Sequence, residues 1–221
     1  MRELIFDTET TGFDPLSGDR LIEIGLVEMV DQSLTGNHYH VYVNPERDVP
    51  ESAVKIHGLT TEFLSDKQVF SEVMDEFLEY IGDDSVLVAH NAEFDMKFIN
   101  WELENAGRPI IHKKRFIDTL AIARTKFPGS PNSLDALCKR FMINNAHRTL
   151  HGALLDAEIL AEVYIELLGG RQGGMDLTVQ KSAAAAIVKK KREPRSFPVS
   201  EDELAAHAAF IKQLKNPIWN Q

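Results

Sequence analysis

The sequence predicts an α/β protein in which a mixed sheet is flanked by helices and followed by a separate helical segment. Two observations support this class. Segments typical of strands come first, and further along the chain short apolar runs alternate with segments of helical periodicity. A stretch rich in glycine and then in basic residues separates this body from a capped amphipathic segment. We therefore expect a domain over residues 1–168, a flexible linker over 169–199, and a tethered helix with its tail over 200–221.

The first strand is predicted from the apolar run 4–6, and the turn residue Gly12 marks its end. Further strands are expected at 21–27 and at 38–43, where a proline follows the run. The connections between these three segments are short. Short connections favour an antiparallel meander, with the first strand at one side of it.

Helical periodicity begins with residues 71–81, whose apolar side chains recur near the 3.6-residue period. Ser71 is the expected N-cap of this helix and Gly82 its end. The apolar run 86–89 predicts a buried strand parallel to the first, and a helix follows it to about Ala106. The remaining elements are expected as a strand at 116–118 and helices at 120–127, 133–141 and 152–168.

The charge of the chain is acidic and unevenly distributed. The 24 Lys and Arg residues face 34 Asp and Glu residues, which gives a net charge of −10. Residues 1–168 carry −14 and residues 169–221 carry +4. An acidic body argues against strong unaided binding to nucleic acid, because phosphate contacts need Lys and Arg. If the body acts on nucleic acid, its substrate must be delivered to it.

The single cysteine, Cys138, rules out an internal disulfide framework, and its helix-like surroundings predict a small core residue. No signal peptide is recognisable, because acidic residues flank the only apolar run near the N-terminus. No segment approaches the ~20 apolar residues of a membrane span. A reducing cytoplasm is therefore the expected compartment, without a membrane partner.

Asp7 and Glu9 are the first candidates for chemistry. Side chains of a strand alternate between its faces, so these two carboxylates point the same way, roughly 6–7 Å apart along the strand. Neighbouring acids near a core raise each other's pKa and need a cation. Hard divalent ions prefer oxygen ligands, which makes Mg²⁺ or Mn²⁺ the expected partner. A solvated strand end with two ordinary surface acids is the alternative.

Three further residues fit the same chemistry. Asp95 follows a predicted buried strand at the start of a helix, and Asp156 lies in the first turns of the 152–168 helix beside apolar residues. Within one continuous helix, His151 and Asp156 would point about 140° apart. They converge only if His151 precedes the helix, which the glycine that follows it allows.

Four carboxylates and a histidine suit phosphodiester hydrolysis with two metal ions. Asp7 is expected to bridge both ions, with Glu9, Asp95 and Asp156 completing the cage. His151 is expected to be the general base, because the usual pKa of histidine is close to working pH. Imidazole is not a favoured Mg²⁺ ligand, so the role of base suits this residue better than the role of ligand.

Three segments then connect the chain to a known family. Residues 7–12 (DTETTG), 90–95 (HNAEFD) and 151–156 (HGALLD) resemble, in order, the three motifs of the DEDDh 3′→5′ exonucleases. Residues 132–138 and 148–157 are similar to the proofreading subunits of bacterial replicative DNA polymerases. The resemblance implies a ribonuclease-H-like exonuclease fold, two Mg²⁺ or Mn²⁺ ions, hydrolysis from the 3′ end of DNA, and release of nucleoside 5′-monophosphates.

The resemblance also implies contacts to the terminal nucleotide. Backbone groups of Thr8 and Gly12 would contact this nucleotide, and His57 resembles the family's substrate-side histidine. The ring of Phe94 would press on the terminal base or sugar, since aromatic rings stack on bases. The alternatives are an ordinary loop histidine at position 57 and a plain core residue at position 94.

Three functions fit the sequence: a proofreading exonuclease subunit, a stand-alone DEDDh exonuclease that trims RNA or short oligonucleotides, and an interaction module. The terminal segment begins with a capping box at Ser200 and Glu203, and its tether favours the first function. The resemblance implies that residues 200–221 bind the catalytic subunit of the polymerase. The segment from Gln172 to Leu177 loosely resembles peptides that dock on bacterial sliding clamps, with a plain linker as the alternative.

Overall fold

The computed structural model describes residues 1–146, 148, 150–170 and 198–214. The chain divides into two compact units, Met1–Met175 and Asp176–Gln221. Among the described residues, the first unit contains a five-stranded sheet with helices on both faces, and the second contains a helix. No helix in these described ranges is long and apolar enough to cross a membrane.

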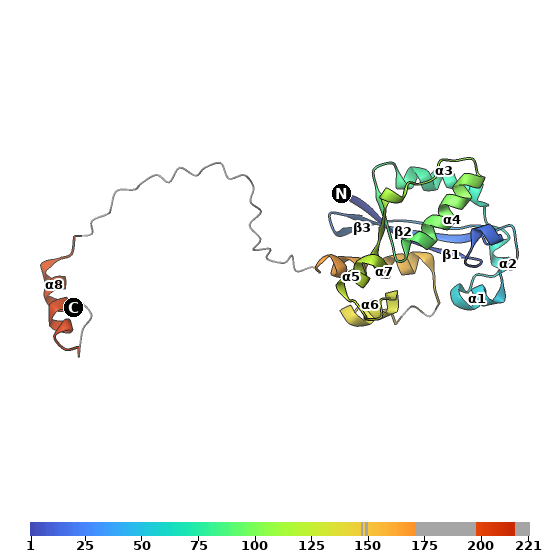
Figure 1. The fold of residues 1–221 in the computed structure, drawn as a ribbon. Helices are drawn as coiled ribbons and strands as arrows, with labels where there is room; N and C mark the ends of the chain where they lie inside the picture. The colour runs from blue at the N-terminus through green and yellow to red at the C-terminus, as the bar shows by residue number, and fades with distance from the viewer. Residues whose placement is uncertain (147, 149, 171–197, 215–221) are drawn as a thin grey trace. The chain divides into compact units, whose positions relative to one another are not determined.

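The sheet is mixed and has the first strand of the chain at its centre (Figure 1). Its strands are β1 (Arg2–Thr10), β2 (Leu21–Val30), β3 (Ser33–Tyr42), β4 (Val86–Ala89) and β5 (Phe116–Asp118), in the spatial order β3-β2-β1-β4-β5. The pairs β1–β2 and β2–β3 are antiparallel, which confirms the predicted meander. The pairs β1–β4 and β4–β5 are parallel, and parallel neighbours need crossover connections, which here contain helices.

β2 and β3 are longer than the sequence predicts. They meet in a tight hairpin turn at Asp31 and Gln32, which both adopt positive φ angles, of 50° and 63°. The turn has no glycine, so the usual hairpin signal is missing. The first half of β3 is exposed at the edge of the sheet and carries polar side chains, which is why residues 33–37 resemble a loop in sequence.

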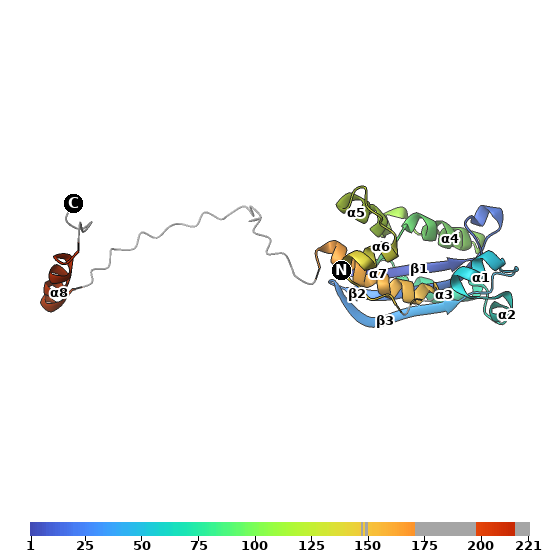
Figure 2. The same cartoon turned by 90° about the horizontal axis from the view of Figure 1, so that it is seen from below.

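Helices cover both faces of the sheet (Figures 1 and 2). One face is covered by α3 (Phe70–Ile81) and α4 (Ala92–Asn105). The other is covered by α7 (Ala153–Leu168), with α5 (Thr119–Lys126) and α6 (Leu134–Phe141) packed against it. The shorter elements of this unit are α1 (Glu51–His57), α2 (Thr61–Leu64) and the 3-10 turns η1 (Pro15–Ser17) and η2 (Lys113–Arg115).

The start of α3 differs from the prediction. Its N-cap is Val69 and its first residue is Phe70, so Ser71 is not the cap. The backbone N–H of Val69 donates to Oε2 of Glu72 at 3.2 Å, so the side chain of Glu72 satisfies one polar group at the helix start and the N-cap side chain satisfies none. Burial of Phe70, which is 2% exposed, accounts for the earlier start. Gly82 ends the helix as predicted, with a φ angle of 55°.

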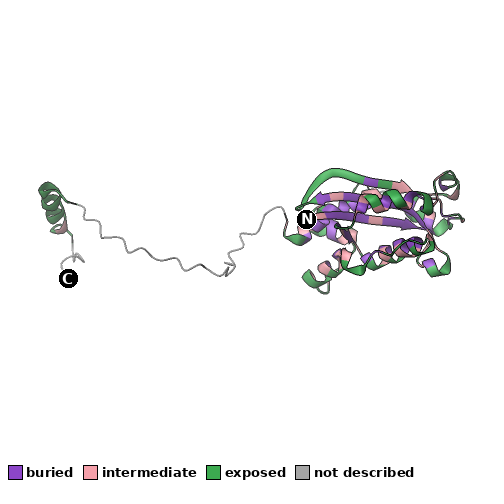
Figure 3. Ribbon diagram, turned by 90° about the horizontal axis from the view of Figure 1, so that it is seen from above, coloured by how far each residue is buried: buried purple, intermediate pink, exposed green. Residues whose placement is uncertain are grey.

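The two faces of β1 belong to two hydrophobic clusters, which Figure 3 shows as the buried interior of the sheet. Leu4 and Phe6 belong to the cluster under α3 and α4. Ile5 belongs to the cluster under α7. Because alternate residues of a strand share a face, Asp7 and Glu9 point to the α7 side together with Ile5.

A third hydrophobic cluster joins α5 and α6 to the middle and end of α7. Cys138 is fully buried in this cluster as a free thiol, which confirms the prediction of a small core residue. Ile159 and Val163 enter the cluster from α7, whereas Leu160 and Tyr164 of the same helix pack on the sheet. Helix α7 is therefore buried on two sides, and a helix with this much apolar contact has little freedom to shift.

The described part of the second unit contains α8 (Glu201–Ile211). The predicted capping box is confirmed: the backbone N–H of Glu203 donates to Ser200 Oγ at 3.3 Å, and Glu203 Oε2 accepts from the backbone N–H of Ser200 at 3.0 Å. Large apolar side chains remain exposed on this helix, with Leu204 at 55% and Phe210 at 58%. The Gln172–Leu177 segment and the last residues of the predicted tail, 215–221, lie outside the described residues.

Candidate active site

The site is built around the C-terminal end of β1. Asp7 lies opposite Gly25 of β2 in the antiparallel register. A Cβ atom at Gly25 would lie 2.2 Å from the backbone nitrogen of Leu154 and 2.4 Å from the carbonyl carbon of Ala153. Only glycine at this position lets the first turn of α7 approach the sheet so closely. Gly25 thereby brings Asp156, in the same first turn, beside the carboxylates of β1.

Asp95 reaches the site from the first turn of α4, on the other side of β1. Its carboxylate is 3% exposed, and Oδ1 accepts a 2.7 Å hydrogen bond from the hydroxyl of Thr8. Thr8 is buried as well. It lies between Asp7 and Glu9 in the sequence, so its side chain points to the opposite face of the strand. The strand therefore supplies two carboxylates on one face and a positioning hydroxyl on the other.

His151 lies just before α7, whose N-cap is Gly152. Its backbone N–H donates to the carbonyl of Ile56 at 3.0 Å, which ties this segment to α1. In this position His151 and Asp156 converge, and His151 Nδ1 lies 3.1 Å from Asp156 Oδ2. The sequence analysis required His151 to precede the helix if the two side chains were to converge, and in the structure His151 is not part of the continuous helix.

A cavity of about 290 Å³ brings most of the predicted residues together. Seven of them line it: Asp7, Thr8, Glu9, Phe94, Asp95, His151 and Asp156. The other lining residues are His90, Asn91, Ser133, Leu134, Asp135 and Arg148. Gly12 and His57 are not among the lining residues. The cavity is therefore a concave acidic site of the kind expected for a catalytic centre.

Burial raises the pKa values of three carboxylates in this cavity, those of Asp7, Glu9 and Asp95. It is the largest cause for Glu9, whose pKa rises from 4.5 to about 8, and the charge of Glu23 adds to the effect. Burial also raises the pKa of Asp95 to about 7, against a lowering hydrogen bond from Thr8. The pKa of Asp7 lies well above its usual value because of burial and then the charges of Asp95 and Glu9. The cluster resists full ionisation unless a cation joins it.

Arg148 is a site residue that the sequence analysis missed. Its guanidinium makes two hydrogen bonds to the carboxylate of Asp156, from Nε at 2.5 Å and from Nη2 at 2.6 Å. It also reaches His151 and Asp135. A loop arginine ordinarily indicates a solvated surface charge, and the family-like segment 148–157, which begins at this residue, was the available signal. Gly25 was also missed, although a glycine inside a strand is a known signal of close backbone approach.

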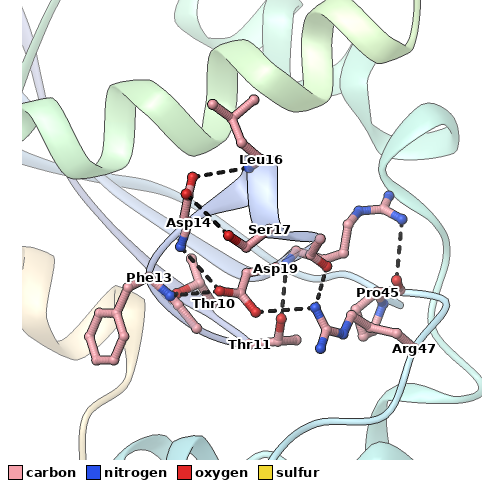
Figure 4. Close-up of polar contacts among 12 residues, drawn as sticks. Thr10, Thr11, Phe13, Asp14, Leu16, Ser17, Asp19, Pro45 and Arg47 are labelled. Atoms are coloured by element: carbon pink, nitrogen blue, oxygen red, sulfur yellow. Dashed lines mark hydrogen bonds and ion pairs between the residues drawn. The ribbon is translucent and has the colours of Figure 1, made fainter.

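Gly12 lies in the loop that follows β1. Figure 4 shows that Asp19 closes this loop through contacts to Phe13 and Asp14. Asp19 Oδ2 accepts from the backbone N–H of Phe13 at 2.9 Å and of Asp14 at 3.1 Å, and Oδ1 pairs with Arg47 at 3.1 Å. A Cβ atom at Gly12 would lie 2.2 Å from Asp19 Oδ2, so a side chain at this position would displace the Asp19 carboxylate that closes the loop. The structure therefore gives Gly12 a role in the loop itself.

His57 and Phe94 differ in their relation to the cavity, because Phe94 lines it and His57 does not. His57 ends α1 and is 6% exposed, and its Nδ1 accepts from the backbone N–H of Leu59 at 3.0 Å. Burial lowers the pKa of His57, which favours the neutral ring. Phe94 lines the cavity while its ring also contacts Phe98 of the core, with centroids 5.1 Å apart. Phe94 therefore packs against the core and is also accessible from the cavity, and its predicted contact with the terminal base or sugar stays a prediction.

The donor set fits divalent metal ions. Glu9, His151 and Asp156 each offer one ligand atom, and these atoms lie within 4.8 Å of one another. Carboxylate oxygens predominate in the cavity, and hard divalent cations prefer oxygen ligands. The raised pKa values of Asp7, Glu9 and Asp95 add a second argument, because a bound cation would restore these groups to their ordinary ionisation.

The mixed sheet and the buried carboxylate cluster beside a histidine define the class of protein: a metal-dependent exonuclease with the ribonuclease-H-like fold of the DEDDh enzymes. The family model described as Exonuclease matches residues 4–164. Among solved structures, the chain resembles Exonuclease X in complex with 5′ overhanging duplex DNA, with a TM-score of 0.59 and 29% identity over 76% of this chain and 90% of that one. The nuclease domain of 3′hExo, a DEDDh family member bound to rAMP, shares the fold, with a TM-score of 0.65 and 18% identity over 76% and 91%.

The zinc-bound form of the Escherichia coli ExoI–ssDNA complex also shares the fold, with a TM-score of 0.66 and 18% identity over 77% of this chain and 41% of that one. Curated relatives match almost the whole chain. DNA polymerase III subunit epsilon of Rickettsia conorii is 49% identical over 97% of this chain and 96% of its own length. The same subunit of Escherichia coli K12 is 45% identical over 95% and 92%. The chain belongs to the family of DNA polymerase III epsilon subunits, and it is a 3′→5′ exonuclease.

Proposed function

We propose that this chain proofreads DNA synthesis by hydrolysing mispaired 3′-terminal nucleotides at the cluster of Asp7, Glu9, Asp95 and Asp156. The observation that supports this site is the excess of buried carboxylates over cations in one cavity. Among the described residues that line it, Arg148 is the single lysine or arginine. The four carboxylates would hold two Mg²⁺ or Mn²⁺ ions, with Asp7 contributing to both.

When bound, the two ions would stabilise the charge on the attacking and leaving oxygens of an in-line displacement at phosphorus. The residues of the chain position the carboxylates and accept the proton. Thr8 fixes the carboxylate of Asp95 through its 2.7 Å hydrogen bond. His151, which is 46% exposed at the mouth of the cavity, takes the proton of the attacking water. Its position before α7 gives it this access while Asp156 stays buried.

Contacts to the terminal nucleotide are proposed for the residues around the cavity. Phe94 presents its ring to the cavity and is held by Phe98, which suits stacking on a base or sugar. The backbone of β1 at Thr8 lies in the cavity wall. Gly12 and His57 would act from the margins, and the unpartnered Nε2 of the buried His57 is a free polar atom for a substrate contact.

The named relatives are subunits of a polymerase and match this chain over nearly its full length. This agreement disfavours a stand-alone enzyme that trims RNA, because the match includes the residues beyond the exonuclease domain. We propose residues 1–168 as the exonuclease domain, 169–199 as a linker, and 200–221 as the segment that binds the polymerase catalytic subunit. The exposed Leu204 and Phe210 on α8 are suitable anchors for such a partner.

The attachment is tested by removing residues 200–221. We expect the truncated chain to hydrolyse free single-stranded DNA at the rate of the full chain and to lose co-purification with the polymerase catalytic subunit. A double substitution, Leu204→Asp with Phe210→Asp, is the matched test in the full chain, since both side chains are exposed and tolerate charge in the fold. Undiminished binding by the truncated chain would place the attachment elsewhere.

The segment from Gln172 to Leu177 lies outside the described residues, and its docking on a sliding clamp stays a proposal. It is supported by the apolar side chains of Met175 and Leu177 beside a glutamine, in a stretch with no predicted core to hold them. The test compares clamp binding of the full chain with that of a variant carrying Gln172→Ala and Met175→Ala. Equal clamp binding by the two proteins would refute the proposal.

The proofreading function is tested by digestion of primer–template DNA with the purified chain. We expect faster release of nucleoside monophosphates from a mismatched 3′ end than from a matched one, because unpaired termini enter a single-strand site at lower cost. Single-stranded RNA of the same length serves as the comparison for the trimming alternative. Preferential digestion of the RNA, with no effect of the mismatch, would contradict the proposed function.

A further inference from the structure

The guanidinium of Arg148 lies in the carboxylate cluster and is bonded to Asp156. Its side chain is 8% exposed, and the carboxylate of Asp156 beside it is 3% exposed. The two hydrogen bonds to Asp156, at 2.5 and 2.6 Å, form a bidentate pair in which each carboxylate oxygen accepts one N–H. A buried arginine in this arrangement is a strong internal cation, because its guanidinium cannot lose its proton.

The same guanidinium also engages the proposed base. Nη2 of Arg148 lies 2.8 Å from Nδ1 of His151. A guanidinium has donors and no acceptor, so Nδ1 must be the acceptor and its lone pair is used. This nitrogen is the one that faces Asp156, at 3.1 Å. In this arrangement one side chain holds a proposed metal ligand and the proposed base at once.

These contacts compete with divalent ions for the cluster. A divalent ion on Asp156 would lie within a few ångströms of the guanidinium, and like charges at that distance in a buried site repel strongly. The lone pair of His151 Nδ1 is unavailable for a proton while Arg148 donates to it. Either the ions do not bind, or Arg148 loses its inner contacts, which are those to Asp156 and His151.

The surroundings of Arg148 provide an outer position. Nη1 donates to Asp135 Oδ1 at 2.7 Å, and Asp135, in the first turn of α6, is 64% exposed at the rim. Asn145 donates to the same oxygen at 3.0 Å and accepts, through its carbonyl, from the backbone N–H of Arg148. Rotation of the long side chain about its χ angles would therefore break the inner contacts and leave the rim contact in place.

We propose that Arg148 is a positioning residue that fills the carboxylate cluster as an internal cation until divalent ions enter, and then withdraws to Asp135. In the metal-free protein it neutralises Asp156 and holds His151 in place. Metal entry releases both residues for the reaction. This inference rests on the proposed roles of Asp156 and His151, and it adds a competition between arginine and metal that those roles do not contain.

The first test measures Mn²⁺ binding to the full chain by calorimetry. Arg148→Gln removes the competing charge, so we expect Mn²⁺ to bind at least about tenfold more tightly than in the wild type. The metal-free variant should melt at a lower temperature, because Asp156 loses its cation. Arg108→Gln is the matched control, since Arg108 pairs with Asp75 and does not line the cavity. Unchanged or weaker Mn²⁺ binding by Arg148→Gln would overturn the inference.

The second test observes the arginine directly and needs no substitution that affects folding. In the wild-type chain with chelator, the Nε–H signal of Arg148 in a ¹H–¹⁵N spectrum should be slow to exchange with water, because it is buried and bonded to Asp156. Saturating Mg²⁺ should shift this signal and accelerate its exchange. A signal that keeps its position and protection at saturating Mg²⁺ would show that Arg148 stays, and the competition would be refuted.

Asp156→Asn separates this inference from the proposed function. If Asp156→Asn weakens Mn²⁺ binding while Arg148→Gln does not strengthen it, the ligand assignment stands and the competition fails. If Asp156→Asn leaves Mn²⁺ binding unchanged, the ligand assignment itself fails. Arg148→Lys keeps the charge without the bidentate fork, so we expect it to restore the melting temperature of the metal-free protein only in part.

Discussion

Glu9→Gln should stabilise the metal-free protein above neutral pH. The pKa of Glu9 is raised from 4.5 to about 8, mainly by burial. At about 1.4 kcal/mol per pKa unit, this rise corresponds to at most about 5 kcal/mol of lost stability when Glu9 is ionised in the unfolded chain at pH 8. Solvent entry and small side-chain shifts reduce such penalties, so we expect a gain of about 1–3 kcal/mol from the neutral isostere.

The sign of the pH dependence follows from the same shift. Between pH 4.5 and about 8 the folded state binds the Glu9 proton more tightly than the unfolded state does. The free energy of unfolding therefore falls as pH rises through this window, and below it the penalty disappears. Glu9→Gln should be close to wild type at pH 4.5 and should exceed it progressively toward pH 8. The difference between the two proteins removes the contribution of groups that titrate in both.

Urea denaturation in the presence of a chelator measures this difference at several pH values. Glu158→Gln is the matched control, because Glu158 lies on the exposed side of α7 and should give no such trend. Adding Mg²⁺ should reverse the order, since the wild type gains a ligand that the variant lacks. The reasoning would be refuted if Glu9→Gln destabilised the metal-free protein at pH 8, or if the difference did not grow with pH.

Three further predictions concern single positions. Asp7→Ala should abolish Mg²⁺-dependent cleavage while circular dichroism shows an intact fold, and cleavage near the wild-type level would contradict the assignment. His151→Ala should lower kcat by about 10²–10⁴ with little loss of metal affinity in calorimetry, whereas a large loss of affinity would make His151 a ligand. Gly25→Ala should destabilise the fold by several kcal/mol in urea, roughly 2–4, because its Cβ would meet the backbone of Leu154 at 2.2 Å; a change below about 1 kcal/mol would mean that α7 shifts freely.

The elements that carry the strongest periodicity could be predicted from sequence, and the exposed ones could not. β1 and α7 are buried on the faces that pack in the core, so the hydrophobic pattern of the sequence locates both elements. The first half of β3 is an exposed edge, where burial imposes no alternation on residues 33–37. At the start of α3, burial of Phe70 outweighed the capping preference of Ser71. Tertiary packing decided both differences.

The site shows the same division. Asp7 and Glu9 could be placed together because strand alternation is a local rule. Asp95 and Asp156 could be proposed because each acid occurs where a core residue is expected, and acids are rarely buried without a partner. The contact of Arg148 with Asp156 could not be predicted, because it depends on where a loop folds back over α7. Such a contact joins residues eight positions apart through a conformation that no local pattern encodes.

The carboxylates of this site differ from the other buried acids because fewer cations and hydrogen-bond donors surround them. Elsewhere in the described part of the chain the fold gives each buried acid a partner. Those partners are Tyr164 for Glu3, His40 for Glu23 and Arg20 for Glu102. At the site, Arg148 pairs with Asp156 and the hydroxyl of Thr8 donates to Asp95, but no described side chain donates to Asp7 or Glu9, so one cation faces four carboxylates. Buried charges without partners destabilise a fold. The shortage therefore needs a ligand from outside the chain, and hard divalent cations are the ligands that clustered carboxylates bind best.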